Sequence, residues 1–178
     1  CLGNLCSNPK NLELIVSSGA LKTVITYAFP STDTSANVQF MAVAAIRGLA
    51  AHPVLRSQIV REGAMEPLIL SASQGTVEVQ REAAAAFCNL ALSEENKVKM
   101  ARGGALGALI SLAMSGDHER EVHAAAALAN IAEMVEGKSQ ERMIEEGSIK
   151  PLMRLADSED PEVRREAARA FALFASKR

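Results

Sequence analysis

The chain has 178 residues, of which 48% are hydrophobic and 22% charged, and its 19 Lys and Arg residues against 21 Asp and Glu give a formal charge of −2. A chain of this length can bury a core without disulfides or metal. Near-neutral charge disfavours a general nucleic-acid binder, and no apolar run reaches the roughly 18 residues of a membrane span. We therefore expect an intracellular, cytoplasmic domain that binds no nucleic acid and does not insert into a membrane.

The three cysteines give no sign of a disulfide or zinc framework. Cys1, Cys6 and Cys88 are odd in number and lack the paired spacing of metal ligands. They are expected to be reduced thiols, as in an intracellular protein. The chain starts at Cys1 without a signal-peptide pattern, so the true N-terminus is expected to lie outside this sequence.

A glycine followed by small or apolar residues recurs four times, at steps of 44, 41 and 43 residues. The four marks are Gly19-Ala20-Leu21, Gly63-Ala64-Met65, Gly104-Ala105-Leu106 and Gly147-Ser148-Ile149. An amphipathic stretch precedes each glycine, and an apolar stretch follows it: Leu21 to Phe29, Met65 to Leu70, Leu106 to Met114 and Ile149 to Leu155. An alanine-rich stretch completes each unit: Val38 to Ala50, Val79 to Leu92, Val122 to Met134 and Val163 to Ala175. Apolar residues at helical spacing predict three helices per unit.

Local signals agree with these boundaries. A glycine between two helices allows a positive φ without a Cβ clash. Pro67 and Pro151 are expected near the first turn of their helices, where a missing N–H is tolerated. Asp160 before Pro161 is expected to cap the last helix. Because no segment alternates as a strand, we predict an all-α chain.

The period, the glycine between the first two helices, and third helices that read AAAAFCNLA (83–91) and AAAALANIA (124–132) resemble the armadillo repeat family. The resemblance covers essentially the whole chain and implies a right-handed α-solenoid whose third helices line a concave groove. Stacking is needed because one helical triplet cannot bury its own apolar faces. HEAT repeats have a similar period but two helices per unit, and rank second.

The resemblance divides the chain into four complete repeats, preceded by the end of a partial one in residues 1–6. The complete repeats are expected at 7–51, 52–93, 94–135 and 136–178. Leu49, Leu90 and Ile131 then occupy one equivalent position that faces the core. Neither end shows a polar cap, so we expect a segment of a longer solenoid, and self-association through exposed apolar ends around Leu2, Leu5, Phe171, Leu173 and Phe174.

In this family, asparagines on the groove side of the third helices hold the backbone of an extended peptide. The positions that match are Asn4, Asn89 and Asn130. Gly48 and Leu173 occupy the equivalent positions in the first and fourth complete repeats, so this row of asparagines, here called the ladder, is interrupted there. The alternative is that each amide bonds to neighbouring backbone.

The same face carries arginines. Arg81, Arg165 and Arg169 share it by helical geometry, and together with Arg47 they make it modestly basic. The tryptophans of importin-alpha-type grooves are missing, since the chain has none, so the chain is expected to be catenin-like or vacuolar-protein-type, with a partner that is acidic. The alternative is that these arginines pair with Glu82 and Glu166.

We therefore predict an interaction scaffold that binds an extended protein or peptide segment along the groove. A regulatory domain for a small ligand and an internal spacer remain alternatives. No enzyme activity, cofactor or metal is expected, because His52, His118 and His123 form no ligand pair and a lone Cys88 in an alanine-rich helix is more often a packing residue.

Overall fold

The computed structural model describes residues 11, 14–15, 18–31, 35–133 and 138–175. Within these residues the chain forms helices joined by turns and short loops, with no strand. The second helices of the units are α3 (Ala20–Ala28), α6 (Met65–Gln74), α9 (Ala105–Ala113) and α12 (Ile149–Ala156). The third helices are α4 (Ala36–Ala50), α7 (Val77–Leu90), α10 (His118–Ala132) and α13 (Pro161–Ala175). The first helices are α5 (Arg56–Arg61), which follows the short 3-10 helix η1 (Pro53–Leu55), α8 (Glu94–Arg102) and α11 (Lys138–Glu145).

Each third helix begins at a side chain that caps it. Ser35, Thr76, Asp117 and Asp160 accept hydrogen bonds from backbone N–H groups three residues later, at 3.3, 3.4, 3.1 and 3.2 Å. Such caps satisfy N–H groups that the first helical turn leaves without partners. The predicted cap at Asp160 is confirmed, and the other three third helices, α4, α7 and α10, begin two to four residues earlier than their apolar patterns indicated.

The glycine between the first and second helices adopts the left-handed conformation in all four units. Gly19, Gly63, Gly104 and Gly147 have φ of 74°, 95°, 85° and 85°. At Gly63 the chain closes α5 with bonds from Gly63 N to Val60 O and from Ala64 N to Ile59 O, both 3.2 Å. This pair of bonds ends a helix sharply and turns the chain, as a Schellman motif does. The positive φ expected at these positions is confirmed.

Gly104→Ala is expected to lower the free energy of unfolding by about 1–2 kcal/mol, the cost of a left-handed conformation for an alanine. A Cβ at Gly104 would meet only Ile69 Cδ1, at 4.0 Å, so the cost comes from the backbone. Gly107 in α9 is the matched control. It has ordinary helical φ and open space around a new Cβ, so Gly107→Ala should stabilise by roughly 0.5–1 kcal/mol. Urea unfolding of both variants checks the opposite signs, and equal signs would contradict this assignment.

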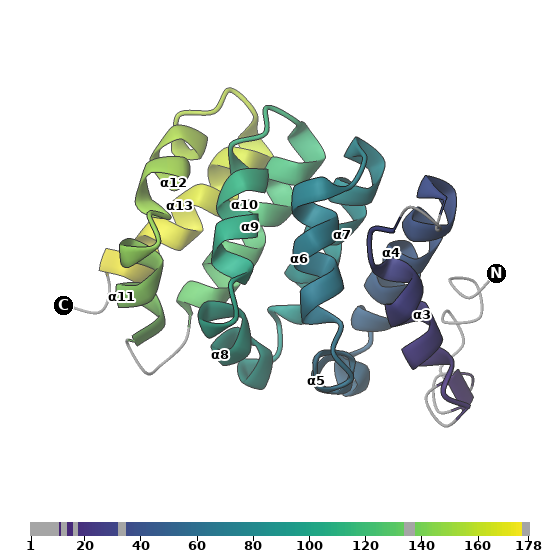
Figure 1. Cartoon of the computed structure of the whole chain (residues 1–178). Coiled ribbons are helices and arrows are strands. Elements are labelled where there is room, and N and C mark those ends of the chain that lie inside the picture. The colour runs from purple at the N-terminus through teal and green to yellow at the C-terminus, as the bar shows by residue number, and fades with distance from the viewer. Residues whose placement is uncertain (1–10, 12–13, 16–17, 32–34, 134–137, 176–178) are drawn as a thin grey trace.

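The second and third helices form two layers that run the length of the molecule (Figure 1). The second helices α3, α6, α9 and α12 pack side by side, and the third helices α4, α7, α10 and α13 pack side by side behind them. Alanines at the third-helix contacts, including Ala83, Ala84, Ala124 and Ala125, are fully buried. Their small side chains let neighbouring helices approach closely, so each unit completes the core of the next.

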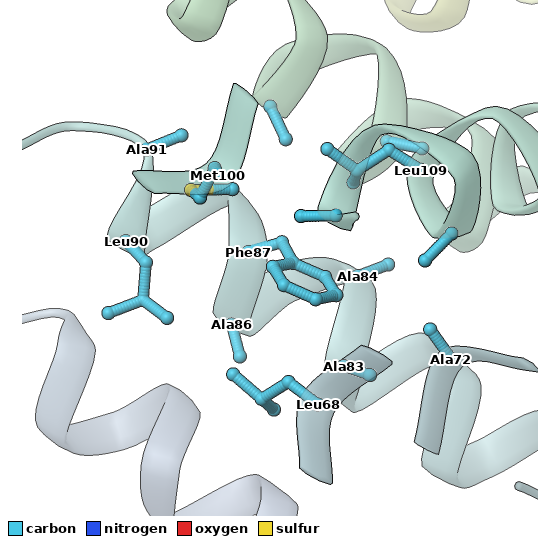
Figure 2. Packing of buried hydrophobic residues seen from close by; sticks show 14 of the residues in the cluster. Leu68, Ala72, Ala83, Ala84, Ala86, Phe87, Leu90, Ala91, Met100 and Leu109 are labelled. Carbon is cyan, nitrogen blue, oxygen red and sulfur yellow. The ribbon is translucent and has the colours of Figure 1, made fainter. Parts of the chain in front are cut away.

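A continuous apolar core lies between the layers. Figure 2 shows Phe87 and Leu90 of α7 with Leu68 of α6, Met100 of α8 and Leu109 of α9, and all five side chains are fully buried. Leu49, Leu90 and Ile131, predicted to share one core-facing position, are 1%, 0% and 0% exposed, which confirms that prediction.

Within the residues that the structure describes, no single helix has the length and apolar content to cross a membrane, although α4 and the following segment Pro53–Arg61 meet the requirement as a pair bent by 110°.

Candidate functional site

The predicted site residues lie along the outer side of α4, α7, α10 and α13, here called the third-helix face. Its residues are Phe40, Met41, Ala44, Arg47, Gly48, Arg81, Glu82, Ala85, Cys88, Asn89, His123, Ala126, Asn130, Arg165, Glu166, Arg169 and Leu173. Asn4 belongs to the predicted ladder but lies outside the described residues.

Asn89 joins α7 to the preceding third helix. Its Nδ2 donates to Arg47 O of α4 at 3.2 Å, across 42 positions of sequence. The residue is half-buried, and among the described residues no hydrogen bond reaches its Oδ1. The amide therefore uses one of its two N–H donors to join the helices and retains an acceptor at the surface.

Asn130 repeats the first of these bonds but is covered. Its Nδ2 donates to Cys88 O of α7 at 3.4 Å, and its Oδ1 accepts from Arg169 Nη2 at 2.9 Å. Only 4% of the residue is exposed. Asn89 and Asn130 thus make the same contact between units. They differ in exposure to solvent, because Arg169 lies over Asn130.

The four predicted arginines all have carboxylate partners. Arg47 pairs with Glu82, and Arg81 Nη2 lies 2.6 Å from Asp117 Oδ2. Arg165 Nη2 and Arg169 Nη2 lie 3.2 and 2.9 Å from the carboxylate of Glu166. Glu82 and Glu166 were named as possible partners from the sequence, whereas Asp117 was not.

These pairs change the charge expected of the third-helix face. Glu119, Glu133 and Glu162 also lie 3.8, 3.1 and 3.9 Å from these arginines, so six carboxylates contact the four guanidinium groups. Two of the six, Asp117 and Glu133, also pair with Arg120 and Lys97. Because these arginines are paired, they give no support to the prediction of an acidic partner.

Asp117 has two roles, as cap of α10 and as partner of an arginine in α7. The hydrogen bond from Arg81, together with the bond from Arg120 N, lowers the pKa of Asp117 to about 2. Because folding depresses this pKa, the charged carboxylate stabilises the fold above about pH 4, and that contribution is lost as the pH falls toward 2.

Asp117→Asn is expected to keep the cap and lose the ion pair. Since Arg81 is 38% exposed, the loss at pH 7 should be below about 1 kcal/mol. The difference from wild type should shrink as the pH falls from 4 to 2, because the wild-type carboxyl then becomes neutral as well. Thermal unfolding across this range measures it, with the exposed Asp157→Asn as control. A difference that stays constant down to pH 2 would show that the ion pair contributes nothing.

The residues considered for chemistry do not converge. Burial raises the pKa of the Cys88 thiol, with a further contribution from the charge of Glu166, and a protonated thiol is a poor nucleophile. His118 Nδ1 lies 2.8 Å from Asp160 Oδ2 at the start of α13, and burial lowers the pKa of His123. In the described part of the chain no group of three His, Cys, Asp or Glu residues is placed to hold a metal ion. Cys1 and Cys6 fall outside that part.

Glu133, the residue that follows α10, contacts the third-helix face and was not predicted from the sequence. Its Oε2 accepts from Lys97 Nζ of α8 at 3.4 Å, and its Oε1 accepts from Arg169 Nη1 at 3.1 Å. Lys97 is 4% exposed and bonds Glu94 more closely, at 2.6 Å, so Glu133 is its second partner. The spacing of three residues from Asn130 to Glu133 was the available signal, because such residues lie on one side of a helix.

Comparison with known proteins places the chain among three-helix repeat proteins. The family model described as Armadillo/beta-catenin-like repeat matches residues 139–174. No curated protein matched the chain.

Several solved structures are similar over nearly the whole chain. Computationally designed armadillo repeat proteins for modular peptide recognition share 30% identity with a TM-score of 0.91, over 99% of this chain and 74% of theirs. A designed armadillo repeat protein solved with the peptide (KR)4 shares 29% identity with a TM-score of 0.89, over 98% of this chain and 72% of that one. A further designed armadillo repeat protein shares 30% identity with a TM-score of 0.90, over 99% and 74% of the two chains.

Proposed function

Because the chain belongs to the armadillo repeat family, we propose that it is a protein-interaction scaffold that binds an extended segment of a partner along the third-helix face. Similar designed proteins recognise peptides, one of them the peptide (KR)4, which supports this proposal. No catalytic role is proposed, since its side chains offer hydrogen bonds and ion pairs and no assembled nucleophile and base.

The acceptor of Asn89 carries the proposal. Its Oδ1 can accept from a backbone N–H of a segment that runs across α7. Ala44, Gly48 and Ala85 beside it are small and half-buried, so the backbone of a partner can come close to the helices. Phe40 and Met41 extend this part of the face with apolar surface, and Met41 is 59% exposed. The open part of the site therefore extends from α4 to α7.

Capture of a partner from the native cell extract, followed by peptide mapping, tests the proposal. The mapped segment should bind Asn89→Ala about two- to tenfold more weakly than wild type, because the hydrogen bond to Oδ1, worth about 0.5–1.5 kcal/mol, is lost. Gln74→Ala is the control, since this exposed carboxamide ends α6 in the other layer. Calorimetry gives the affinities, and equal affinities for both variants would place the partner elsewhere.

The two alternatives have their own signatures in the same experiments. A small metabolite that raises the melting temperature, with no protein captured, would favour the regulatory domain for a small ligand. If no protein is captured and no metabolite raises the melting temperature, an internal spacer would be favoured.

Self-association through the ends is proposed separately. Phe171, Leu173 and Phe174 are half-buried against the core, and Ile144 and Met153 of the same unit are 54% and 58% exposed. Leu2 and Leu5 lie outside the described residues. Light scattering over a concentration series tests this proposal, and a constant monomer mass would contradict it.

A further inference from the structure

Arg169 lies in a set of four acceptors on the third-helix face. Its Nη2 donates to Asn130 Oδ1 at 2.9 Å and to Ala126 O at 3.2 Å. Its Nη1 donates to Glu133 Oε1 at 3.1 Å, and its Nε donates to Glu166 Oε2 at 3.0 Å. All three nitrogens of the guanidinium thus have acceptors, two of which are carboxylates.

Contacts outside the set hold these acceptors in position. Asn130 is fixed by its bond to Cys88 O, and Glu133 accepts a 3.4 Å bond from Lys97, whose shorter bond of 2.6 Å goes to Glu94. Glu166, whose side chain is 12% exposed, also bonds Arg165. A site whose acceptors are oriented before the ligand arrives loses little free energy in ordering them.

Arg169 covers one rung and leaves the other open. The residue equivalent to Arg169 in the preceding unit is Ala126. Its short side chain does not cover the Oδ1 of Asn89. The side chain of Arg169 is itself 36% exposed, which allows it to turn into solvent without unpacking the core. Its departure would leave two carboxylates and two neutral acceptors facing one position.

From this geometry we infer that the position over α10 is a binding site for a guanidinium group, occupied in the free protein by Arg169. The inference rests on the proposed function: a partner segment that extends past α7 inserts an arginine side chain here, and Arg169 turns away. The two carboxylates that Arg169 would leave, Glu133 and Glu166, favour a cationic side chain over an anionic one at this position. The Oδ1 of Asn130 is therefore unavailable to a partner until a competing guanidinium displaces Arg169.

The first experiment tests the site without any partner. Arg169→Ala is titrated with methylguanidinium, and the side-chain amide of Asn130 is followed by NMR, with sodium chloride at equal ionic strength as reference. A saturable shift is expected in Arg169→Ala and in neither wild type nor Arg164→Ala. Arg164 is the matched control, because its guanidinium bonds the loop carbonyls of Ser158 and Glu159 and none of the acceptors of Arg169. Arg169→Gln serves if the alanine variant is unstable.

No saturable shift at Asn130 in the Arg169 variants would overturn the inference, as would the same shift in wild type. A second substitution, Glu133→Gln added to Arg169→Ala, should weaken methylguanidinium binding, and unchanged binding would also count against the site. Since these titrations use no partner, a site found together with failure to capture any partner would leave the inference standing and contradict the proposed function.

The second experiment tests competition, with the peptide (KR)4 as probe and an all-lysine peptide of equal length as reference. Arg169→Ala should bind (KR)4 more tightly than wild type, by about tenfold if Arg169 vacates the site a tenth of the time. Arg164→Ala should equal wild type, and the all-lysine peptide should gain less, because an ammonium cannot match a forked set of acceptors. Equal affinity of wild type and Arg169→Ala for (KR)4 would show that Arg169 does not compete.

Discussion

Shortening Leu90 to alanine is expected to lower the free energy of unfolding by about 2–5 kcal/mol, the usual cost of a large buried side chain and the cavity it leaves. Leu90 is fully buried, and Figure 2 shows it beside Ala86 and Ala91 at the end of α7. Each unit shares its core with its neighbours, so the loss should also broaden or split the unfolding transition. Calorimetry and urea unfolding measure both effects.

Leu92 provides the matched control, two residues further along the chain and 49% exposed. Leu92→Ala should change stability by no more than about 0.5 kcal/mol. Leu49→Ala and Ile131→Ala should resemble Leu90→Ala, because the three residues are equally buried at one position of the repeat. Losses below about 1 kcal/mol at all three would mean that the repeat register is wrong.

Asn130→Ala is expected to cost about 1–3 kcal/mol, because the variant removes the side-chain donor to Cys88 O and one acceptor of Arg169 Nη2 at a position that is 4% exposed. Asn89→Ala should cost less, since water can reach its half-exposed position and replace the lost bond. Urea unfolding should therefore give a larger loss of stability for Asn130→Ala than for Asn89→Ala. Equal losses would contradict the difference in access between the two rungs.

The fold was predictable because its signals are local and repeat. The glycines between helices, the alanine-rich third helices and Pro161 after Asp160 each specify their own backbone, and four copies reinforce the reading. Helix starts were placed less well. Ser35, Thr76 and Asp117 begin their helices before the first apolar residue, because a cap acts through a hydrogen bond and adds nothing to the apolar pattern. The proposed repeat limits, such as 52–93, stay a prediction.

The site was less predictable because its partners lie about one repeat away. The bond from Asn89 to Arg47 O and that from Arg169 to Glu133 join residues 42 and 36 positions apart. Helical periodicity places such residues on one face but cannot tell which of them touch across two helices. The sequence therefore identified Asn89 and Asn130 as one class, while their different exposure depends on Arg169, in the next third helix.

The third-helix face as the place of binding is tested most directly by adding the mapped partner segment to the labelled chain and following two side-chain amides by NMR. We expect the resonances of Asn89 to shift in proportion to the fraction of partner bound, while those of Gln74 on α6 stay in place. Shifts of Gln74 with no change at Asn89 would show that the partner binds the other layer of helices, and the proposed function of this face would be contradicted.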